Sequence, residues 1–127
     1  MFPVGFAYLD FDRTSVAHLW ILIAQPHPEP DERVIVSVTS DGPHVTDRAC
    51  ELAPGDHEFI KHRSFVVFRK ASIVTVGDLQ SWASRGNVNV KAAASPALVD
   101  RIREEALRSP FTSRRVQAAI RDCWWTP

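Results

Sequence analysis

Basic and imidazole side chains gather in one segment of the chain, between residues 54 and 64, which contains His57, Lys61, His62 and Arg63. Cleaving RNA without a metal needs a base for the 2′-hydroxyl proton, an acid for the leaving oxygen and a cation for the charge on phosphorus. Imidazole titrates near neutral pH and can be base or acid, and a fixed ammonium or guanidinium group supplies the cation. We therefore predict a catalytic group of His57, Lys61 and His62, with Arg63 as a substrate-binding cation.

Three further candidates lie at the ends of predicted strands. His18 begins the first hydrophobic strand and is an additional candidate acid or base. Thr39 and Ser40 end the next strand beside a glycine-containing turn, so either hydroxyl is able to bind a phosphate or the edge of a base. The alternative for Thr39 and Ser40 is a plain strand cap without a ligand.

Two other interpretations of the histidine-rich segment stay open. In the first, His57 caps a turn, Lys61 is solvated, and His62 is half-buried against a backbone carbonyl. In the second, His18, Asp56, His57 and His62 hold a metal ion, although their spacing matches no standard zinc pattern. We expect neither a metal nor a cofactor, since the sequence lacks a phosphate-binding glycine loop, a nucleophile elbow and a dinucleotide fingerprint.

Length and composition favour one soluble domain over residues 1–127. A charged fraction of 24% and a hydrophobic fraction of 45% are ordinary for a globular chain. The longest apolar run, residues 19–24, is far shorter than the roughly 20 residues that cross a bilayer, and the first residues do not resemble a signal peptide. We expect a cytoplasmic protein in which Cys50 and Cys123 are reduced and partly buried.

The net charge of zero conceals an asymmetry between the two halves. Residues 1–60 hold 10 acidic and 3 basic residues, and residues 61–127 hold 5 acidic and 12 basic residues. The basic half is able to face phosphates, or the two halves neutralise each other within the fold or across a dimer.

Short hydrophobic runs separated by turns predict a small antiparallel barrel over about residues 17–94. The expected strands are residues 17–24, 33–39, 48–52, 64–69, 72–76 and a brief one at 88–90, and the proline-rich residues 25–32 form a loop. Within this region Gly77 and Asp78 open a short helix, with Asp78 as its candidate N-cap.

Two helices are expected after the barrel. Ser95 and Pro96 predict the start of a helix over about residues 95–108, with a buried stripe that includes Leu98, Ile102 and Ala106. A second helix covers about residues 112–123, capped by Thr112 or Ser113. Trp124 and Trp125 follow it, and an exposed tryptophan pair would indicate a surface for a partner.

The order of these elements resembles the MazF/PemK (CcdB-like) toxins. Residues 18–22 resemble the opening strand of that family, and residues 34–40 are similar to its second strand, which ends in paired hydroxyl residues. Residues 64–76 resemble its paired later strands, and the stretch from Arg85 and Gly86 into the helix opened by Ser95 resembles its closing strand and helix. The likeness covers about residues 17–108.

The resemblance implies a small SH3-like barrel that dimerises and cuts messenger RNA, with Thr39 and Ser40 where the family places a substrate-contacting hydroxyl. The chain departs from the family in two places: residues 26–30 replace a long loop that carries an Arg, and Val67 and Arg69 do not clearly match an Arg and an acid on the later strand. We keep Arg69 as a substrate-binding candidate.

Two hypotheses about function follow. The first is a divergent MazF/PemK-like toxin, a metal-independent endoribonuclease acting on single-stranded RNA as a homodimer and held in check by an antitoxin protein. The second is a non-catalytic SH3-like barrel that binds RNA or a protein partner.

Overall fold

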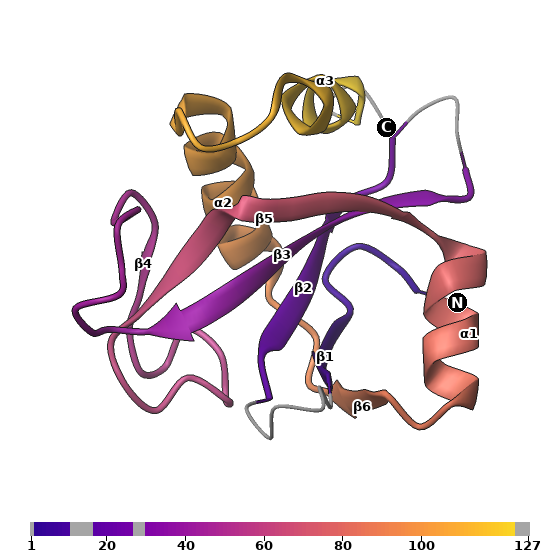
Figure 1. Ribbon diagram of the computed structural model, residues 1–127, viewed down its shortest axis with the longest axis horizontal. Coiled ribbons are helices and arrows are strands. Elements are labelled where there is room, and N and C mark those ends of the chain that lie inside the picture. The colour runs from indigo at the N-terminus through magenta and orange to yellow at the C-terminus, as the bar shows by residue number, and fades with distance from the viewer. Residues whose placement is uncertain (1, 11–16, 27–29, 124–127) are drawn as a thin grey trace.

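The computed structural model describes residues 2–10, 17–26 and 30–123, which form a six-stranded antiparallel sheet and three helices (Figure 1). The strands are β1 (Ala7–Asp10), β2 (Leu19–Ala24), β3 (Glu32–Ser40), β4 (Glu51–Leu52), β5 (Ser64–Thr75) and β6 (Val88–Lys91). They lie in the order β4-β5-β3-β2-β1-β6, and the sheet curls into a half-barrel. This confirms the predicted fold class, a mainly β barrel-like domain followed by two C-terminal helices.

β1 is a strand that the sequence patterns did not predict. It pairs with β2 on one side and with β6 on the other, from Ala7 opposite Lys91 to Asp10 opposite Val88. Its four residues are too few to show a clear alternation. The strand-forming part of the chain therefore begins ten residues earlier than the expected boundary at residue 17.

β5 is one long strand where two short ones were expected. Between the pairs Ile35–Ser72 and Ser37–Val67, β3 advances by two residues while β5 advances by five. The additional residues bulge out of the ladder, and a bulge changes the direction in which the side chains of a strand point. The charged residues Arg69 and Lys70 lie in this bulge, which explains why the hydrophobic pattern breaks there.

Each of the three helices begins at a side-chain cap. α1 (Val76–Ser84) is capped by Thr75 and not by Asp78, which occupies the third helical position and completes a capping box with Thr75. α2 (Pro96–Arg108) begins after Ser95, and α3 (Arg114–Asp122) begins after Ser113, as the sequence predicts. None of the helices in the described part of the chain is long and apolar enough to cross a membrane.

The helices cover the two faces of the sheet unequally. α2 and α3 pack together on one face, over β2, β3 and β5, and bury the main hydrophobic core (Figure 1). α1 and the N-terminal segment pack on the other face, in a smaller cluster that includes Tyr8, Leu22, Ile35 and Leu79. No described helix covers the rest of this second face, and the residues that line it beside the ends of β2 and β3 are largely polar.

Candidate functional site

A cleft of about 710 Å³ opens beside the uncovered part of the sheet. It lies within the size range of ligand sites in proteins. Its walls come from the ends of β2, β3 and β5 and from the loops at residues 41–50 and 53–63. The polar and charged residues that line it are His18, Ser37, Thr39, Ser40, His44, Thr46, Asp47, Lys61, His62, Ser64, Arg69 and Lys70.

Strand register places two of the predicted residues next to each other on the floor of the cleft. β2 begins at Leu19, which pairs with Val38, so His18 directly precedes β2 beside the end of β3 that carries Thr39. Both residues line the cleft. His18 and Thr39 therefore belong to one local group, as both predictions require.

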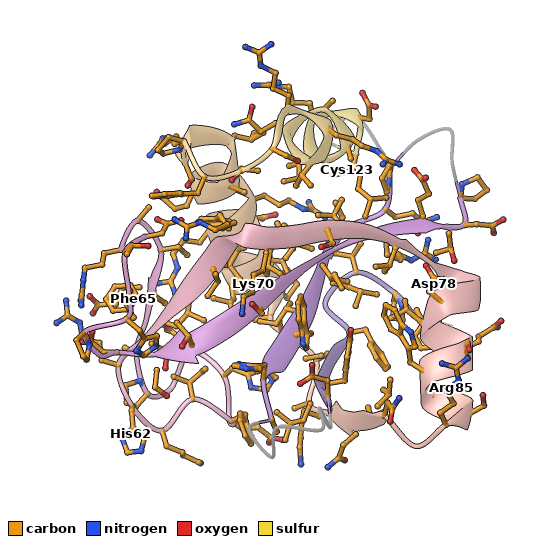
Figure 2. The ribbon with its side chains drawn as sticks, viewed as in Figure 1. His62, Phe65, Lys70, Asp78, Arg85 and Cys123 are labelled. Carbon is orange, nitrogen blue, oxygen red and sulfur yellow. The ribbon has the colours of Figure 1, made fainter. Side chains whose placement is uncertain are left out.

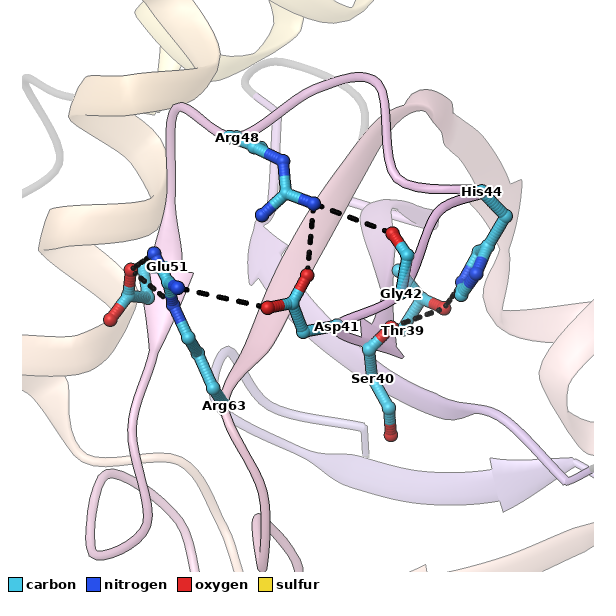
Figure 3. Close-up of polar contacts among 8 residues, drawn as sticks. All are labelled: Thr39, Ser40, Asp41, Gly42, His44, Arg48, Glu51 and Arg63. Carbon is cyan, nitrogen blue, oxygen red and sulfur yellow. Dashed lines mark hydrogen bonds and ion pairs between the residues drawn. The ribbon is translucent and has the colours of Figure 1, made fainter.

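His44 joins this group, and the sequence analysis missed it. The Nε2 atom of His44 lies 2.9 Å from the Oγ1 atom of Thr39, close enough for a hydrogen bond in which either group can donate (Figure 3). The turn after β3 returns the chain to the strand end, with the N–H of Val45 bonding the carbonyl of Gly42 at 3.1 Å. The signal in the sequence is an Asp-Gly-Pro turn directly between Thr39 and His44.

His62 and Lys61 reach the cleft from the loop on the other side. Ser40, the last residue of β3, pairs with Ser64, the first residue of β5, and the N–H of Asp41 bonds the carbonyl of Arg63 at 2.9 Å. This pairing brings the loop that contains His44 beside the loop that contains His62. Lys61 is exposed, as the alternative interpretation also expects, but His62 is exposed as well and is not the half-buried residue of that interpretation.

His57 does not belong to the cleft, and here the predicted group of His57, Lys61 and His62 needs correction. Its side chain is only 5% exposed, and both ring nitrogens are bonded to backbone: Nδ1 accepts from the N–H of Phe59 at 3.0 Å, and Nε2 lies 2.6 Å from the carbonyl oxygen of Ala92. With both nitrogens engaged, the ring holds the loop against the segment before α2. His57 therefore has a structural position.

Arg63, predicted as a substrate-binding cation, is directed away from the cleft into an ion network. Its guanidinium lies 2.8 Å from Glu51 and 3.7 Å from Asp41, and Asp41 in turn lies 3.0 Å from Arg48 (Figure 3). Both guanidinium groups also cover the ring of Phe65, at 4.9 Å for Arg48 and 5.3 Å for Arg63. The network fixes the base of the loop that carries His44.

The charges of this network also act on the carboxyl group of Asp41. Desolvation raises its pKa, but the hydrogen bond and positive charge of Arg48, with smaller effects from Gly42 and Arg63, outweigh this and hold the pKa below its usual value. Asp41 therefore stays ionised and keeps the loop anchored at neutral pH.

Two basic residues from the β5 bulge line the far part of the cleft. Arg69, a predicted candidate, and Lys70, which was not predicted, both follow the point where β5 leaves the ladder with β3. Figure 2 shows Lys70 near the middle of the sheet and His62 beyond its end, both away from α1 with its labelled Asp78 and Arg85. Cations are thus present along the cleft and not only at one loop.

Few acidic groups oppose these cations. Asp47 is the one acidic residue among the described residues that line the cleft, and it accepts a hydrogen bond from the hydroxyl of Ser109 at 3.2 Å. Against it stand Lys61, Arg69 and Lys70, together with three imidazoles. The cleft is therefore suited to an anionic ligand.

The geometry gives no support to the metal-site alternative. Within residues 2–10, 17–26 and 30–123, no group of three or more His, Cys, Asp or Glu side chains lies together as a metal site requires. Asp56 is engaged by Arg101 at 2.9 Å, and His57 is bonded to backbone, so these two proposed ligands are not directed at His18 or His62. Cys50 and Cys123 are both free and buried, as expected.

Some predicted features lie outside the described residues. The tryptophan pair at 124 and 125 and part of the proline-rich loop, residues 27–29, are among them. The remaining tryptophans, Trp20 and Trp82, are partly buried and pack against the smaller core cluster.

Comparisons of the chain with protein-family models, with curated proteins and with solved structures found no match. The chemistry of the cleft itself is therefore the basis for any functional conclusion.

Proposed function

We propose that this protein is a metal-independent endoribonuclease that acts on single-stranded RNA, as expected of a divergent cytoplasmic toxin of the MazF/PemK kind. One observation carries the proposal: three imidazoles and three cations line one cleft around the Thr39 hydroxyl, and Asp47, the one carboxylate among the described residues that line it, is already hydrogen-bonded. These are the groups that phosphodiester cleavage by an internal 2′-hydroxyl needs.

The reaction is a transfer within the RNA strand. One imidazole takes the proton of the 2′-hydroxyl as the 2′-oxygen bonds to phosphorus, and a second, protonated imidazole gives its proton to the 5′-oxygen as the bond from phosphorus to that oxygen breaks. The products are a 2′,3′-cyclic phosphate and a 5′-hydroxyl end. His44 and His62, from the two loops that meet at the start of β5, are our candidates for this pair, with His18 as the third.

The cations have a separate task. The phosphoryl group carries more negative charge in the transition state than in the bound strand, so a preorganised cation lowers the barrier. Lys61, directly beside His62, is our candidate for this role. Arg69 and Lys70 are further along the cleft and are assigned to the flanking phosphates, while Thr39 orients His44 through its hydroxyl.

Incubation of the purified protein with unstructured and structured RNA in excess chelator tests the proposal. We expect cleavage of the unstructured RNA, 2′,3′-cyclic phosphate ends, and a loss of at least about 100-fold in His44→Gln and His62→Gln, since each would lack a proton-transfer group. Arg85→Ala, a charge change on α1 away from the cleft, is the matched control and should cut like the wild type. Intact RNA with the folded wild type would refute catalysis and leave the non-catalytic barrel.

The toxin assignment needs its own test, because cleavage in vitro does not establish a role in the cell. We expect that induced expression of the wild type slows growth and that His62→Gln relieves this at equal protein level. We also expect that a protein encoded by a neighbouring gene binds the chain and neutralises it, and that the chain sediments as a homodimer. Unchanged growth at high expression of an enzyme active in vitro would contradict the toxin role.

A further inference from the structure

Two phenylalanine rings are partly exposed in or near the cleft, and a cation lies over each. Phe59 is 39% exposed and lines the cleft, with the Nζ atom of Lys91 lying 5.9 Å from its ring centroid. Phe111 is 37% exposed in the connection between α2 and α3, with the guanidinium carbon of Arg69 lying 4.9 Å from its ring centroid. Single exposed apolar residues are common on protein surfaces, but here each ring combines an exposed part with a cation over it.

Phe59 lines the cleft itself, whereas Phe111 is connected to it through Arg69, which lines it. Phe59 belongs to the loop that also carries Lys61 and His62, immediately before β5. The guanidinium of Arg69 lies over the Phe111 ring, and Arg69 is in the bulge of β5, further along the strand than Ser64. The imidazole group at Thr39 lies beside the start of β5, since Thr39 pairs with Phe65.

We propose that Phe59 and Phe111 are stacking platforms for two unpaired bases of the bound RNA, one near the reacting phosphate and one further along the strand. This inference rests on the proposed function, and it names what the cleft recognises besides phosphate. Bases stack on exposed aromatic rings in most proteins that bind single strands, whatever the sequence. A cation on the opposite face of such a ring favours it further, because it also attracts the phosphates beside the base.

The surroundings of the rings favour RNA over an apolar protein partner. Phe111 follows Arg108 and precedes Arg114 and Arg115 in the sequence, and Arg69 lies over its ring, so the neighbourhood is strongly basic. Phe59 lines the cleft together with Lys61, and the ammonium group of Lys91 lies over its ring. A surface for an apolar partner would instead be continuous and poor in charge at its centre.

Stacking on both rings also explains a preference for single strands. A paired base has both faces covered by its neighbours in the helix and cannot present one to a phenyl ring. Duplex RNA would retain only its phosphate contacts in the cleft. The rings would therefore determine which form of RNA is bound, while the cations determine that a nucleic acid is bound at all.

The test measures binding of two short fluorescent RNA strands to the full chain. Both strands carry 2′-O-methyl groups, so that they cannot be cut, and they differ only in that one lacks its bases. We expect Phe59→Leu and Phe111→Leu each to weaken binding of the base-bearing strand by at least about fivefold, the lower limit for one stacked base, and to change binding of the abasic strand by less than twofold. Val90→Ala, at a 61% exposed side chain on β6, is the control and should bind both like the wild type.

The outcomes separate the two proposals. If the wild type binds neither strand, the proposed function is refuted and the stacking sites with it. If the wild type binds and both leucine variants bind the base-bearing strand as tightly as it does, stacking is refuted and the proposed function stands. The same holds if both variants lose affinity for the base-bearing and the abasic strand equally. A protein-docking role of the rings would also leave binding of the base-bearing strand unchanged in both leucine variants.

Discussion

Replacing His57 should damage folding and leave the chemistry intact, and this tests the assignment of the cleft. Because its Nδ1 accepts the N–H of Phe59, the ring proton lies on Nε2, which donates to Ala92. Phe59 and Ala92 are themselves exposed, so water replaces part of both bonds in His57→Ala, and we take the lower end of the cost, about 1 kcal/mol for each. Loss of the buried ring itself adds a similar amount, for a total of about 3 kcal/mol.

A loss of this size is a large share of the stability of a small domain and is easily measured. It should lower the midpoint of thermal unfolding by about 10 °C for a chain of this length. His57→Gln can keep the donor to Ala92 and His57→Asn can keep the acceptor for Phe59, so each should lose less than His57→Ala. The stability of His57→Gln relative to His57→Ala measures the hydrogen bond to Ala92, and that of His57→Asn relative to His57→Ala measures the hydrogen bond from Phe59.

The assay is urea unfolding followed by circular dichroism, with RNA cleavage measured in parallel and divided by the folded fraction. We expect lower stability in His57→Ala and an unchanged cleavage rate per folded molecule. A stability within about 0.5 kcal/mol of the wild type, the range of neutral surface changes, would refute the structural role. A folded His57→Ala that no longer cuts would show that the ring takes part in the reaction and that our cleft is assigned wrongly.

Three further predictions concern the loop, its anchor and the core. Thr39→Val removes the hydrogen bond to His44 and should slow cleavage by about tenfold with unchanged stability, while Thr39→Ser keeps the hydroxyl and the rate; equal rates in both variants would contradict a positioning role. Arg48 holds the pKa of the Asp41 carboxyl below its value in the unfolded chain, so the ionised carboxylate stabilises the fold. This stabilisation is complete above about pH 4 and is lost as the pH falls through the folded pKa. The stabilities of the wild type and Asp41→Asn should therefore differ at neutral pH and converge in acid. Burial raises the pKa of Cys50 to about 11, so iodoacetamide at pH 8 should label this thiol only after unfolding, and rapid labelling of the native protein would show that it is accessible.

Local signals in the sequence were sufficient for most of the fold. Ser95 with Pro96 gave the start of α2, because a side-chain cap and a proline at the first helical position act within one turn. The strand ends of β2 and β3 followed from hydrophobic runs and turn residues. The sequence patterns did not predict the elements that depend on non-local pairing. β1 is only four residues long and is a strand because it pairs with β2 on one side and β6 on the other. The bulge in β5 likewise depends on pairing with β3.

The candidate site divides in the same way. Residue type predicted that Lys61 and His62 would share a site with His18 and Thr39, and all four do line the same cleft. The sequence could not distinguish His57 from His44, because the difference is burial: one ring is enclosed and bonded to backbone at both nitrogens, and the other is directed at a hydroxyl in the cleft. His44 and His57, which lie in two neighbouring loops, thus have different roles.

The asymmetry of charge along the chain leads both to ion pairs between its two halves and to cations that line the cleft. Acids of the first half neutralise bases of the second half where Glu51 pairs with Arg63 and Asp56 pairs with Arg101. These ion pairs neutralise Arg63 and Arg101 outside the cleft and connect the N-terminal half of the chain to the C-terminal half. Lys61, Arg69 and Lys70 instead line the cleft, where the nearest carboxylate is engaged by a serine. A chain of zero net charge can therefore present a positive cleft where acidic side chains pair with bases in other parts of the fold. Such a separation of charge favours the binding of an anionic strand.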